Sequence, residues 1–393
     1  MSGLKVIAPG STIGILGGGQ LGRMMALAGT NLGYRFVTLE PTPDSPCGQV
    51  TDQIVASYSD KSAARELASR SDVITYEFEN VDAEVAALLE DLSHVPQGSR
   101  LLHTTQHRLR EKKAIEAAGV PVAPYREIRS EQELSEAVES LGIPSVLKTA
   151  TGGYDGKGQW VIRSAEEIPE AYETLSKACT ELVLEKFIRF DKELSVVAAR
   201  SPRGEIKTFP VAENIHVDNI LHASIVPARI DDGIQQEAER LAARIAESLE
   251  AVGLLAVELF LTDSGELYVN ELAPRPHNSG HYTMEACKTS QFEQHVRAIC
   301  NLPLGDTSLL SPVVMVNVLG EHMEAVVQGL VSGTWIQEND AEPVPAVVPK
   351  VHLYGKSGSA AKRKMGHINL LCDNVQEGMN FIQQTKIWRN QQK

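Results

Sequence analysis

The chain has 393 residues, of which 42% are hydrophobic and 22% charged, as expected for a folded protein of two or three domains. Its 37 Lys and Arg against 51 Asp and Glu give a net charge of −14. A field of that sign repels the phosphates of DNA and RNA, which argues against general nucleic-acid binding.

The sequence also argues against a membrane protein or an exported one. No apolar run approaches the roughly 18 residues that cross a bilayer, and the first residues contain no secretory signal. The five cysteines include no C-x-x-C pair, and their spacing matches neither a zinc site nor a small disulfide framework. We therefore expect a cytoplasmic protein without membrane contact, whose cysteines are reduced thiols packed as small apolar groups.

The first hundred residues alternate short apolar runs with helical stretches. Residues 12–16, 35–40 and 72–78 predict strands, and residues 21–28 and 63–69 predict helices. Such alternation favours a parallel sheet with crossover helices, the arrangement of an α/β domain.

The pattern changes twice along the chain. Residues 94–106 show no regular element, and a charged helical segment follows over residues 107–119. We place the first boundary there, which gives an N-terminal Rossmann-like domain over residues 1–105. Residues 106–300 mix hairpins with helices, an α+β pattern, and residues 301–393 hold enough strand-like runs for a small β-rich C-terminal domain.

The first predicted strand runs into a glycine-rich turn. Residues 17–22 read GGGQLG, which satisfies G-x-G-x-x-G at the start of a helix, and Glu40 ends the next strand. Glycines let the backbone approach a phosphate, and the N–H groups at a helix N-terminus hold it. The motif is compatible with NAD or FAD, with a different phosphorylated ligand, or with a tight turn that binds nothing.

A second glycine-rich loop follows Lys148. This lysine lies on a predicted strand over residues 145–150, and residues 151–158, TGGYDGKG, contain four glycines. Such backbone can fold over a polyphosphate, with Lys148 at its base and Lys157 inside it, which suits phosphoryl transfer. The loop does not match a Walker A motif. An exposed hairpin loop is the alternative interpretation.

Two glutamates flank a predicted hairpin turn. Glu258 and Glu271 lie on either side of residues 263–265, and period-2 counting turns both toward the same face. As diagonal neighbours they would lie about 7–8 Å apart at Cα, close enough to share a Mg²⁺ ion. Asn270 would point to the other face unless a bulge intervenes. The alternative is an edge strand whose glutamates face solvent.

Two further segments give weaker signals. Glu185 ends a strand-like run over residues 182–185, where a carboxylate can accept an adenine amine or simply face solvent. Between Lys350 and Leu370 there are five Lys or Arg and no Asp or Glu. In an acidic protein such a segment attracts anions, although a solvated basic loop has the same composition.

Taken together, Lys148, the glycine loop, Glu185 and the two facing glutamates resemble the ATP-grasp superfamily. Six motifs in chain order are similar to those of one family within it, the N5-carboxyaminoimidazole ribonucleotide synthetases. They are IGILGGGQLGRMM, ITYEFENV, QHRLREKKAIEAAGVP, LKTATGGYDGKGQ, VELFLT with LYVNELAPRPHNSGHYT, and HLYGKSG with KRKMGHINL. The resemblance implies an ATP-grasp domain over residues 106–300, with its flap near residues 150–160, between a pre-ATP-grasp N-terminal domain and the small C-terminal domain.

The resemblance also implies a reaction. ATP, bicarbonate and 5-aminoimidazole ribonucleotide would give N5-carboxyaminoimidazole ribonucleotide, ADP and phosphate, through carboxyphosphate, in de novo purine biosynthesis. A closing flap makes sense for such chemistry, because water would destroy carboxyphosphate. The cofactors implied are ATP and Mg²⁺, and the assembly implied is a homodimer.

The family's nucleotide and metal residues carry over to matching positions. The nucleotide contacts fall on Arg108, Lys148, Gly153, Tyr154, Asp155, Gly156, Lys157, Gly158, Gln159, Glu185, Lys186, Phe187, Ile188, Glu193, His216, Asn270 and Glu271. The metal ligands fall on Glu258 and Glu271. The residues implied at the reacting groups are Lys148, Tyr154, Asp155 and Arg275.

A related family, the formate-dependent glycinamide ribonucleotide transformylases, suggests the ribonucleotide contacts. They are Gln20 and Leu21 at the sugar, Glu77 at its hydroxyls, His277 and Asn278 after the metal ligands, and Lys356, Arg363 and Lys364 at the phosphate. The chain departs from the family pattern at His107, where Asp is usual, and at residues 359–362, which replace a shorter approach to the basic pair.

Three other interpretations stay open at this point. The chain could be another ATP-grasp ligase, either the formate-dependent transformylase or a biotin-carboxylase-like enzyme, although it has no biotinyl Met-Lys-Met segment. It could be an NAD-dependent oxidoreductase built on the GGGQLG turn, which would leave the glutamate pair without a role. It could also bind a nucleotide for regulation without turnover.

Overall fold

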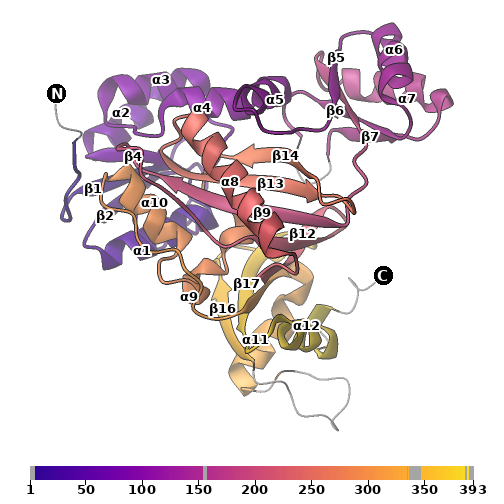
Figure 1. Ribbon diagram of the computed structural model, residues 1–393. Helices are drawn as coiled ribbons and strands as arrows, with labels where there is room; N and C mark the ends of the chain where they lie inside the picture. The colour runs from indigo at the N-terminus through magenta and orange to yellow at the C-terminus, as the bar shows by residue number, and fades with distance from the viewer. Residues whose placement is uncertain (1–4, 154–156, 334, 336–346, 386, 389–393) are drawn as a thin grey trace.

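The computed structural model describes residues 5–153, 157–333, 335, 347–385 and 387–388. Figure 1 shows three parts of the chain gathered around one broad sheet, with a small sheet projecting from one corner. Among the described residues, no helix is long and apolar enough to cross a membrane.

The N-terminal part contains the predicted parallel sheet, whose strand order is β3-β2-β1-β4. Its elements are β1 (Thr12–Leu16), α1 (Gln20–Asn31), β2 (Arg35–Leu39), β3 (Asp52–Ile54), α2 (Lys61–Ser69), β4 (Val73–Tyr76), α3 (Ala83–Leu92) and α4 (Gly98–Thr105). Side chains of Asp60 and Asp82 cap α2 and α3 by accepting backbone N–H groups of the first turn.

The expectation of no regular element over residues 94–106 was wrong, because α4 lies there. This helix is eight residues long and turns only Leu101 and Leu102 fully into the core. Two adjacent apolar residues are too few to reveal a helical period in the sequence.

The middle part begins with α5 (Arg108–Ala117) and a small antiparallel sheet of order β5-β8-β6-β7. The elements of this projecting unit are β5 (Tyr125–Ile128), α6 (Glu131–Leu141), β6 (Ser145–Thr149), β7 (Gln159–Ile162), α7 (Ile168–Ser176) and β8 (Leu182–Lys186). The glycine loop connects β6 to β7, as the hairpin prediction required, since Lys148 pairs with Gln159.

The broad sheet is antiparallel and has the order β14-β13-β9-β11-β12-β15-β17-β16, with β10 paired to β9. The strands and helices of its first half are β9 (Lys192–Arg200), β10 (Ile206–Thr208), β11 (Ala212–Val217), β12 (Ile220–Val226), α8 (Asp232–Ser248), β13 (Gly253–Leu261), β14 (Leu267–Ala273), α9 (Thr283–Ala286) and α10 (Gln291–Ile299). The C-terminal elements are β15 (Val313–Leu319), α11 (Met323–Ser332), β16 (Val348–Leu353), β17 (Lys364–Leu371) and α12 (Val375–Gln384).

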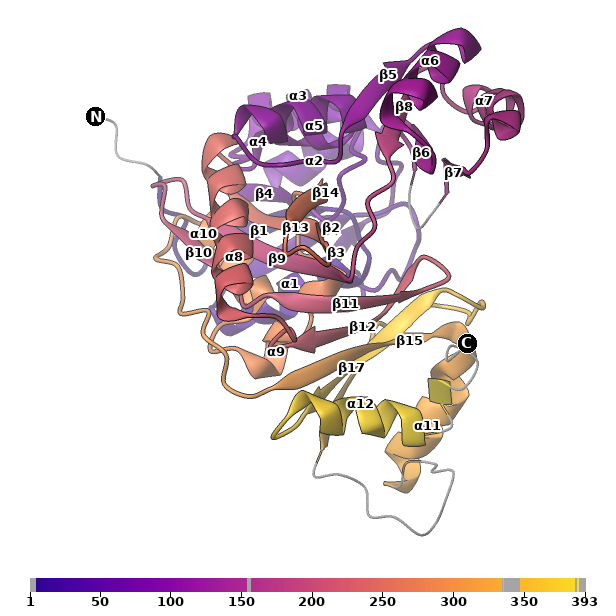
Figure 2. The same ribbon diagram turned by 45° about the vertical axis from the view of Figure 1, so that its right-hand side comes forward.

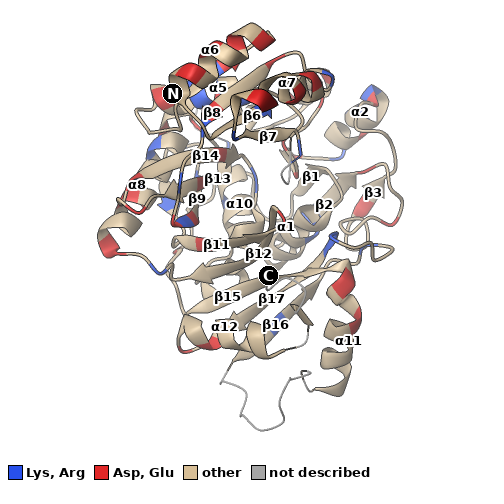
Figure 3. Cartoon of the chain, turned by 90° about the vertical axis from the view of Figure 1, so that its right-hand side faces the viewer, with Lys and Arg blue, Asp and Glu red and all other residues tan. Residues whose placement is uncertain are grey.

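The C-terminal strands continue the broad sheet, because β15 pairs with β12 (Figure 2). One apolar cluster then joins all three parts: Met25 of α1, Phe292 and Val296 of α10, and Tyr354 beyond β16 are buried together. Acidic side chains are spread over α6, α7, α8 and α11 (Figure 3), in keeping with the net charge. The packing therefore fixes the N-terminal sheet, the broad sheet and the basic C-terminal segment around a common space.

Candidate active site

A cavity of about 890 Å³ lies where the parts meet. Its volume is near the upper end of the range for small-molecule sites. The residues predicted from the sequence that line it are Gln20, Leu21, Glu77, Arg108, Lys148, Gly153, Lys157, Gln159, Glu185, Lys186, Phe187, Ile188, Glu193, His216, Glu258, Asn270, Glu271, Arg275, His277, Asn278 and Lys364. Tyr154, Asp155 and Gly156 lie outside the described residues, while Gly158, Lys356 and Arg363 lie beside the cavity rather than on its wall.

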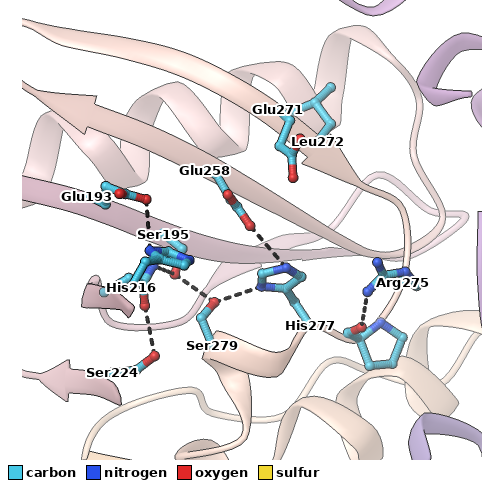
Figure 4. Close-up of polar contacts among 12 residues, drawn as sticks. Glu193, Ser195, His216, Ser224, Glu258, Glu271, Leu272, Arg275, His277 and Ser279 are labelled. Atoms are coloured by element: carbon cyan, nitrogen blue, oxygen red, sulfur yellow. Dashed lines mark hydrogen bonds and ion pairs between the residues drawn. The ribbon is translucent and has the colours of Figure 1, made fainter. Parts of the chain in front are cut away.

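Glu258 and Glu271 are direct cross-strand partners, not the diagonal neighbours expected from the sequence. A bulge in β14 causes the difference: Leu259 pairs with Val269, and Asn270 is the extra residue. The bulge also explains why Asn270 lines the cavity together with both glutamates. Figure 4 shows the two carboxylates projecting from neighbouring strands into the same space.

The two carboxylates have different partners. Glu258 Oε1 lies 3.1 Å from His277 Nε2, and Glu271 Oε2 lies 3.5 Å from Arg108 Nη1. Burial and then the charge of Glu258 raise the pKa of Glu271. Burial alone would also raise the pKa of Glu258. The contact with His277 outweighs the effect of burial, so the pKa of Glu258 is lowered. Two half-buried carboxylates beside an amide oxygen are ligands that fit a hard divalent cation.

Lys148 and Glu185 form a buried ion pair at the base of the glycine loop. Lys148 Nζ lies 3.0 Å from Glu185 Oε2, and Lys112 Nζ of α5 lies 3.2 Å from Oε1. Burial alone would raise the pKa of Glu185, but the two lysines bring it to about 2. The carboxylate is therefore ionised and buried, so the interpretation of a solvated strand end is wrong. Sequence reasoning missed Lys112, which nothing in the sequence distinguishes from the exposed Lys113 beside it.

The flap hairpin is closed by a backbone hydrogen bond from Thr149 N to Gly158 O of 2.9 Å. Gly158 has φ +71°, and a Cβ there would lie 2.6 Å from Thr149 Oγ1, so the loop needs glycine at this position. Further along the cavity, His216 Nδ1 contacts Glu193 Oε2 at 2.9 Å. Burial would lower the pKa of His216, but Glu193 raises it, so the imidazole carries positive charge more readily than usual.

An aromatic pair that sequence reasoning missed also borders the cavity. The rings of Phe190 and Phe260 are stacked, with centroids 4.6 Å apart and an interplanar angle of 7°. Both residues line the cavity. Phe260 is two residues beyond Glu258 on the same face of β13, so period 2 along the strand could have pointed to it.

The N-terminal glycine turn holds a carboxylate of the protein itself. Glu77 accepts hydrogen bonds from the backbone N–H groups of Gly19, at 2.5 Å, and Leu21, at 3.0 Å. A Cβ on Gly19 would lie 2.4 Å from Glu77 Oε1, so the glycine makes room for this contact. Glu40 accepts the N–H of Gly18 in the same way. Donors that a dinucleotide pyrophosphate would need are thus already used, which argues against the NAD interpretation.

Three predicted phosphate ligands, Lys356, Arg363 and Lys364, gather as a basic cluster at the C-terminal side of the cavity. Lys356 Nζ donates to the Lys364 carbonyl at 2.8 Å, and Arg363 Nη1 donates to the Ser357 carbonyl at 2.6 Å. Burial, and next the charge of Arg363, lower the pKa of Lys356 to about 8. Lys364 is the member that reaches the cavity wall.

Two acidic residues of the cavity were not predicted from the sequence. Glu111 of α5 is buried and accepts the N–H of Leu272 at 3.1 Å, and burial together with Glu271 raises its pKa to about 8. Glu79, in the segment after β4, forms an ion pair with Arg275. Glu79 lies in the motif ITYEFENV and Glu111 in QHRLREKKAIEAAGVP. In neither motif does the position of the glutamate distinguish it from an ordinary surface carboxylate.

Three family descriptions match the chain in order. They are the ribonucleotide synthetase preATP-grasp domain at residues 10–106, the ATP-grasp domain at residues 113–292, and the phosphoribosylaminoimidazole carboxylase C-terminal domain at residues 313–380. The chain is 51% identical over 387 residues to N5-carboxyaminoimidazole ribonucleotide synthase of Bacillus subtilis, covering 98% of this chain and 97% of that protein.

Solved structures agree with this relationship. An ADP complex of an N5-carboxyaminoimidazole ribonucleotide synthetase is 54% identical, covers 100% of both chains and has a TM-score of 0.92. The Aspergillus clavatus N5-carboxyaminoimidazole synthase, in complex with ADP and 5-aminoimidazole ribonucleotide, is 30% identical, covers 95% of this chain and 96% of its own, and has a TM-score of 0.83. The chain therefore belongs to the N5-carboxyaminoimidazole ribonucleotide synthase family of ATP-grasp ligases.

Proposed function

We propose that this chain carboxylates 5-aminoimidazole ribonucleotide with bicarbonate and ATP, giving N5-carboxyaminoimidazole ribonucleotide, ADP and phosphate in de novo purine biosynthesis. One observation carries the proposal: a single cavity joins the half-buried Glu258/Glu271 pair to Glu77 and Lys364. A site for phosphoryl transfer and a site for an anionic sugar phosphate are thus continuous. The family relationship over nearly the whole chain supports the same reaction.

The nucleotide would lie between the small sheet and the broad sheet. Lys148 and Arg108 offer positive charge to its phosphates, and the glycine loop, with Tyr154, Asp155 and Lys157, would close over them. Glu185, which is ionised, would accept an adenine amine, and Glu193 would bind the ribose hydroxyls. The stacked Phe190 and Phe260 rings offer an apolar wall.

Mg²⁺ would be held by Glu258 and Glu271. Among the described residues, no group of three or more His, Cys, Asp or Glu is arranged to hold a metal ion, so these two carboxylates need further oxygen ligands from the nucleotide. When bound, the ion offsets the charge of the β- and γ-phosphates during transfer. The raised pKa of Glu271 fits this role, because it reflects a burial cost and a neighbouring charge that a cation would relieve.

The reaction has two steps. An oxygen of bicarbonate attacks the γ-phosphorus, the bond to the ADP oxygen breaks, and carboxyphosphate and ADP result. The amine of the aminoimidazole then attacks the carboxyl carbon, or CO₂ released from it, while phosphate leaves and the amine loses a proton. Lys148, Tyr154, Asp155 and Arg275 are the residues we propose at the reacting groups. A closed flap would exclude water, which would otherwise hydrolyse carboxyphosphate.

The ribonucleotide would lie on the N-terminal side. Gln20, Leu21 and Glu77 face this end of the cavity, and the basic cluster would bind the sugar phosphate. His277 and Asn278 also line the cavity. Both amide atoms of Asn278 are buried without a hydrogen-bond partner among the described residues, which favours a ligand contact. The homodimer and the cytoplasmic location implied by the resemblance stay predictions.

Phosphate release tests the proposal. Mg-ATP is incubated with bicarbonate and 5-aminoimidazole ribonucleotide, and in parallel with formate and glycinamide ribonucleotide. We expect strong stimulation by the first pair only. Stimulation by the second pair alone would make the chain a formate-dependent transformylase, and no stimulation by either would contradict the proposed carboxylation.

A further inference from the structure

Glu79 and Arg275 form an ion pair across the junction between the N-terminal part and the broad sheet. Arg275 Nε lies 2.5 Å from Glu79 Oε2, and its Nη2 lies 3.2 Å from Oε1, so the contact is bidentate. The side chain of Arg275 is 21% exposed and that of Glu79 is 29% exposed, and both line the cavity. This geometry is the strong form of a carboxylate-guanidinium pair.

Two glutamines hold the backbone on either side of this pair. Gln106 Nε2 donates to the Glu79 carbonyl at 2.7 Å, which fixes the segment that carries the carboxylate. Gln97 Nε2 donates to the Pro274 carbonyl at 3.1 Å, which fixes the segment that carries the guanidinium. Glu79 and Arg275 are therefore presented to each other by anchored loops, unlike a surface pair formed by two flexible side chains.

Arg275 also lies in the field of two further carboxylates of the cavity, Glu258 and Glu271. Figure 4 shows its guanidinium on the same side of the sheet as those side chains. Burial alone would raise the pKa of Glu79, but Arg275 outweighs burial and lowers it, so Glu79 stays ionised. Without that charge, the guanidinium would be attracted toward the carboxylates that we propose as metal ligands.

The guanidinium still has donors to offer. Of its five N–H groups, one on Nε and one on Nη2 face Glu79, and one on Nη1 donates to the Pro276 carbonyl at 3.3 Å. Two N–H groups, one on each terminal nitrogen, are left for a ligand. Arg275 lines the cavity together with His277 and Asn278.

We infer that Glu79 is a positioning residue, which holds Arg275 so that these two N–H groups bind the carboxyl group that is transferred, first as bicarbonate. The identity of that group rests on the proposed function. Because Glu79 is two residues from Glu77, the same short segment would bind the ribonucleotide and orient the arginine.

Glu79→Gln tests the inference, since it keeps the shape of the side chain and removes its charge. We expect the KM for bicarbonate to rise about tenfold or more, because losing one charge-assisted hydrogen bond weakens binding by at least that factor. The KM for ATP should change less than about twofold. Glu79→Asp should recover part of the loss. The double variant Glu79→Gln/Arg275→Lys should have nearly the same KM for bicarbonate as Arg275→Lys alone. We expect this because Glu79 acts through the arginine.

Glu250→Gln is the matched control. Glu250 pairs with Arg100 at 3.7 Å, which also links α4 to the broad-sheet part but lies on the exposed surface. We expect wild-type kinetics from this variant. An equal rise of all KM values in Glu79→Gln, with a lowered Tm, would overturn the inference in favour of a purely structural pair.

Crystal structures of the wild type and Glu79→Gln complete the test without any assay. We expect the Arg275 guanidinium to leave its wild-type position in the variant. If it stays in place, the inference is wrong. If the wild type shows no bicarbonate-dependent phosphate release, the proposed function fails, and these structures still decide whether Glu79 holds Arg275.

Discussion

Glu258 and Glu271 face each other directly across β13 and β14, although the register observed near the turn, if continued, would pair Glu258 with Asn270. Leu261 pairs with Leu267 and Leu259 with Val269, and only then does the bulge shift the register by one residue. A single extra residue therefore brings both carboxylates and the Asn270 amide to the cavity. In this pairing the two ionised carboxylates repel each other unless a cation lies between them.

Glu271→Gln is the first prediction. Loss of this carboxylate removes half of the proposed metal site and the partner of Arg108, so phosphate release should fall by at least about a thousandfold. The fold should persist, because the amide has the same shape and the half-exposed side chain is not part of the core. Phosphate release and thermal unfolding measure the two effects.

Glu266→Gln serves as the control for that variant, because Glu266 lies on the same hairpin but is exposed. Its activity should equal that of the wild type. Near-normal turnover in Glu271→Gln would contradict the assignment of the glutamate pair.

Gly19→Ala tests the role of the glycine turn. The added Cβ would lie 2.4 Å from Glu77 Oε1, so either the turn or the carboxylate must move. We expect a loss of about 1–3 kcal/mol in unfolding free energy and a higher KM for the ribonucleotide, with ADP affinity unchanged. Urea unfolding and separate KM values check this.

Gly233→Ala is a matched substitution in α8, where a Cβ would meet nothing within 4 Å. It should stabilise the protein by up to about 1 kcal/mol, since alanine favours helix. A rise in the ADP dissociation constant for Gly19→Ala would mean that the turn binds the nucleotide instead.

The KM for the ribonucleotide should depend on pH through Lys356. Its pKa of about 8 means that the ammonium is charged below pH 8 and loses its proton above it. A sugar phosphate is already doubly ionised above about pH 7, so its own titration does not interfere. The KM should therefore rise with pH above 8, while the KM for ATP stays level.

Lys356→Arg keeps its charge throughout this range and should abolish that rise. Steady-state kinetics between pH 7 and 9.5 compare the two proteins. The same pH dependence in Lys356→Arg would place the titrating group elsewhere.

Lys112→Met probes the buried charge cluster around Glu185. The variant leaves Glu185 with Lys148 alone, at 3.0 Å, in a buried position. Because removing one partner of a buried ionic group is costly, we expect a loss of about 3 kcal/mol in unfolding free energy. Lys113→Met, next to it but exposed, should change little. Equal stability of the two variants would show that Lys112 does not support Glu185.

Periodic patterns were sufficient to predict the strands that carry the site. The runs that became β1, β6, β13 and β14 are short, and their alternation or continuous apolarity, bounded by turn residues, is typical of strands. α4 could not be predicted in this way, since its two buried leucines are adjacent. The sequence alone leaves a bulge at Asn270 open and cannot decide it, because pairing register depends on the partner strand.

Charge partners were the least predictable part of the site. Lys112 and Lys113 are neighbours of one residue type, and only the packing of α5 buries the first and exposes the second. Glu79 and Arg275 are 196 positions apart and meet only when the N-terminal part docks on the broad sheet. The sequence predicts Glu77 as a ligand-binding residue. In the structure its carboxylate also accepts a backbone N–H of the glycine turn.

The most direct test of the central claim is the fate of a labelled oxygen. Bicarbonate carrying ¹⁸O is supplied with Mg-ATP and 5-aminoimidazole ribonucleotide, and the phosphate released early in the reaction is analysed by mass. If bicarbonate attacks the γ-phosphorus, the bridging oxygen of carboxyphosphate stays with phosphate, so each phosphate carries one ¹⁸O atom. Phosphate without ¹⁸O would mean that its fourth oxygen came from solvent, so that water is the nucleophile, and would contradict the mechanism.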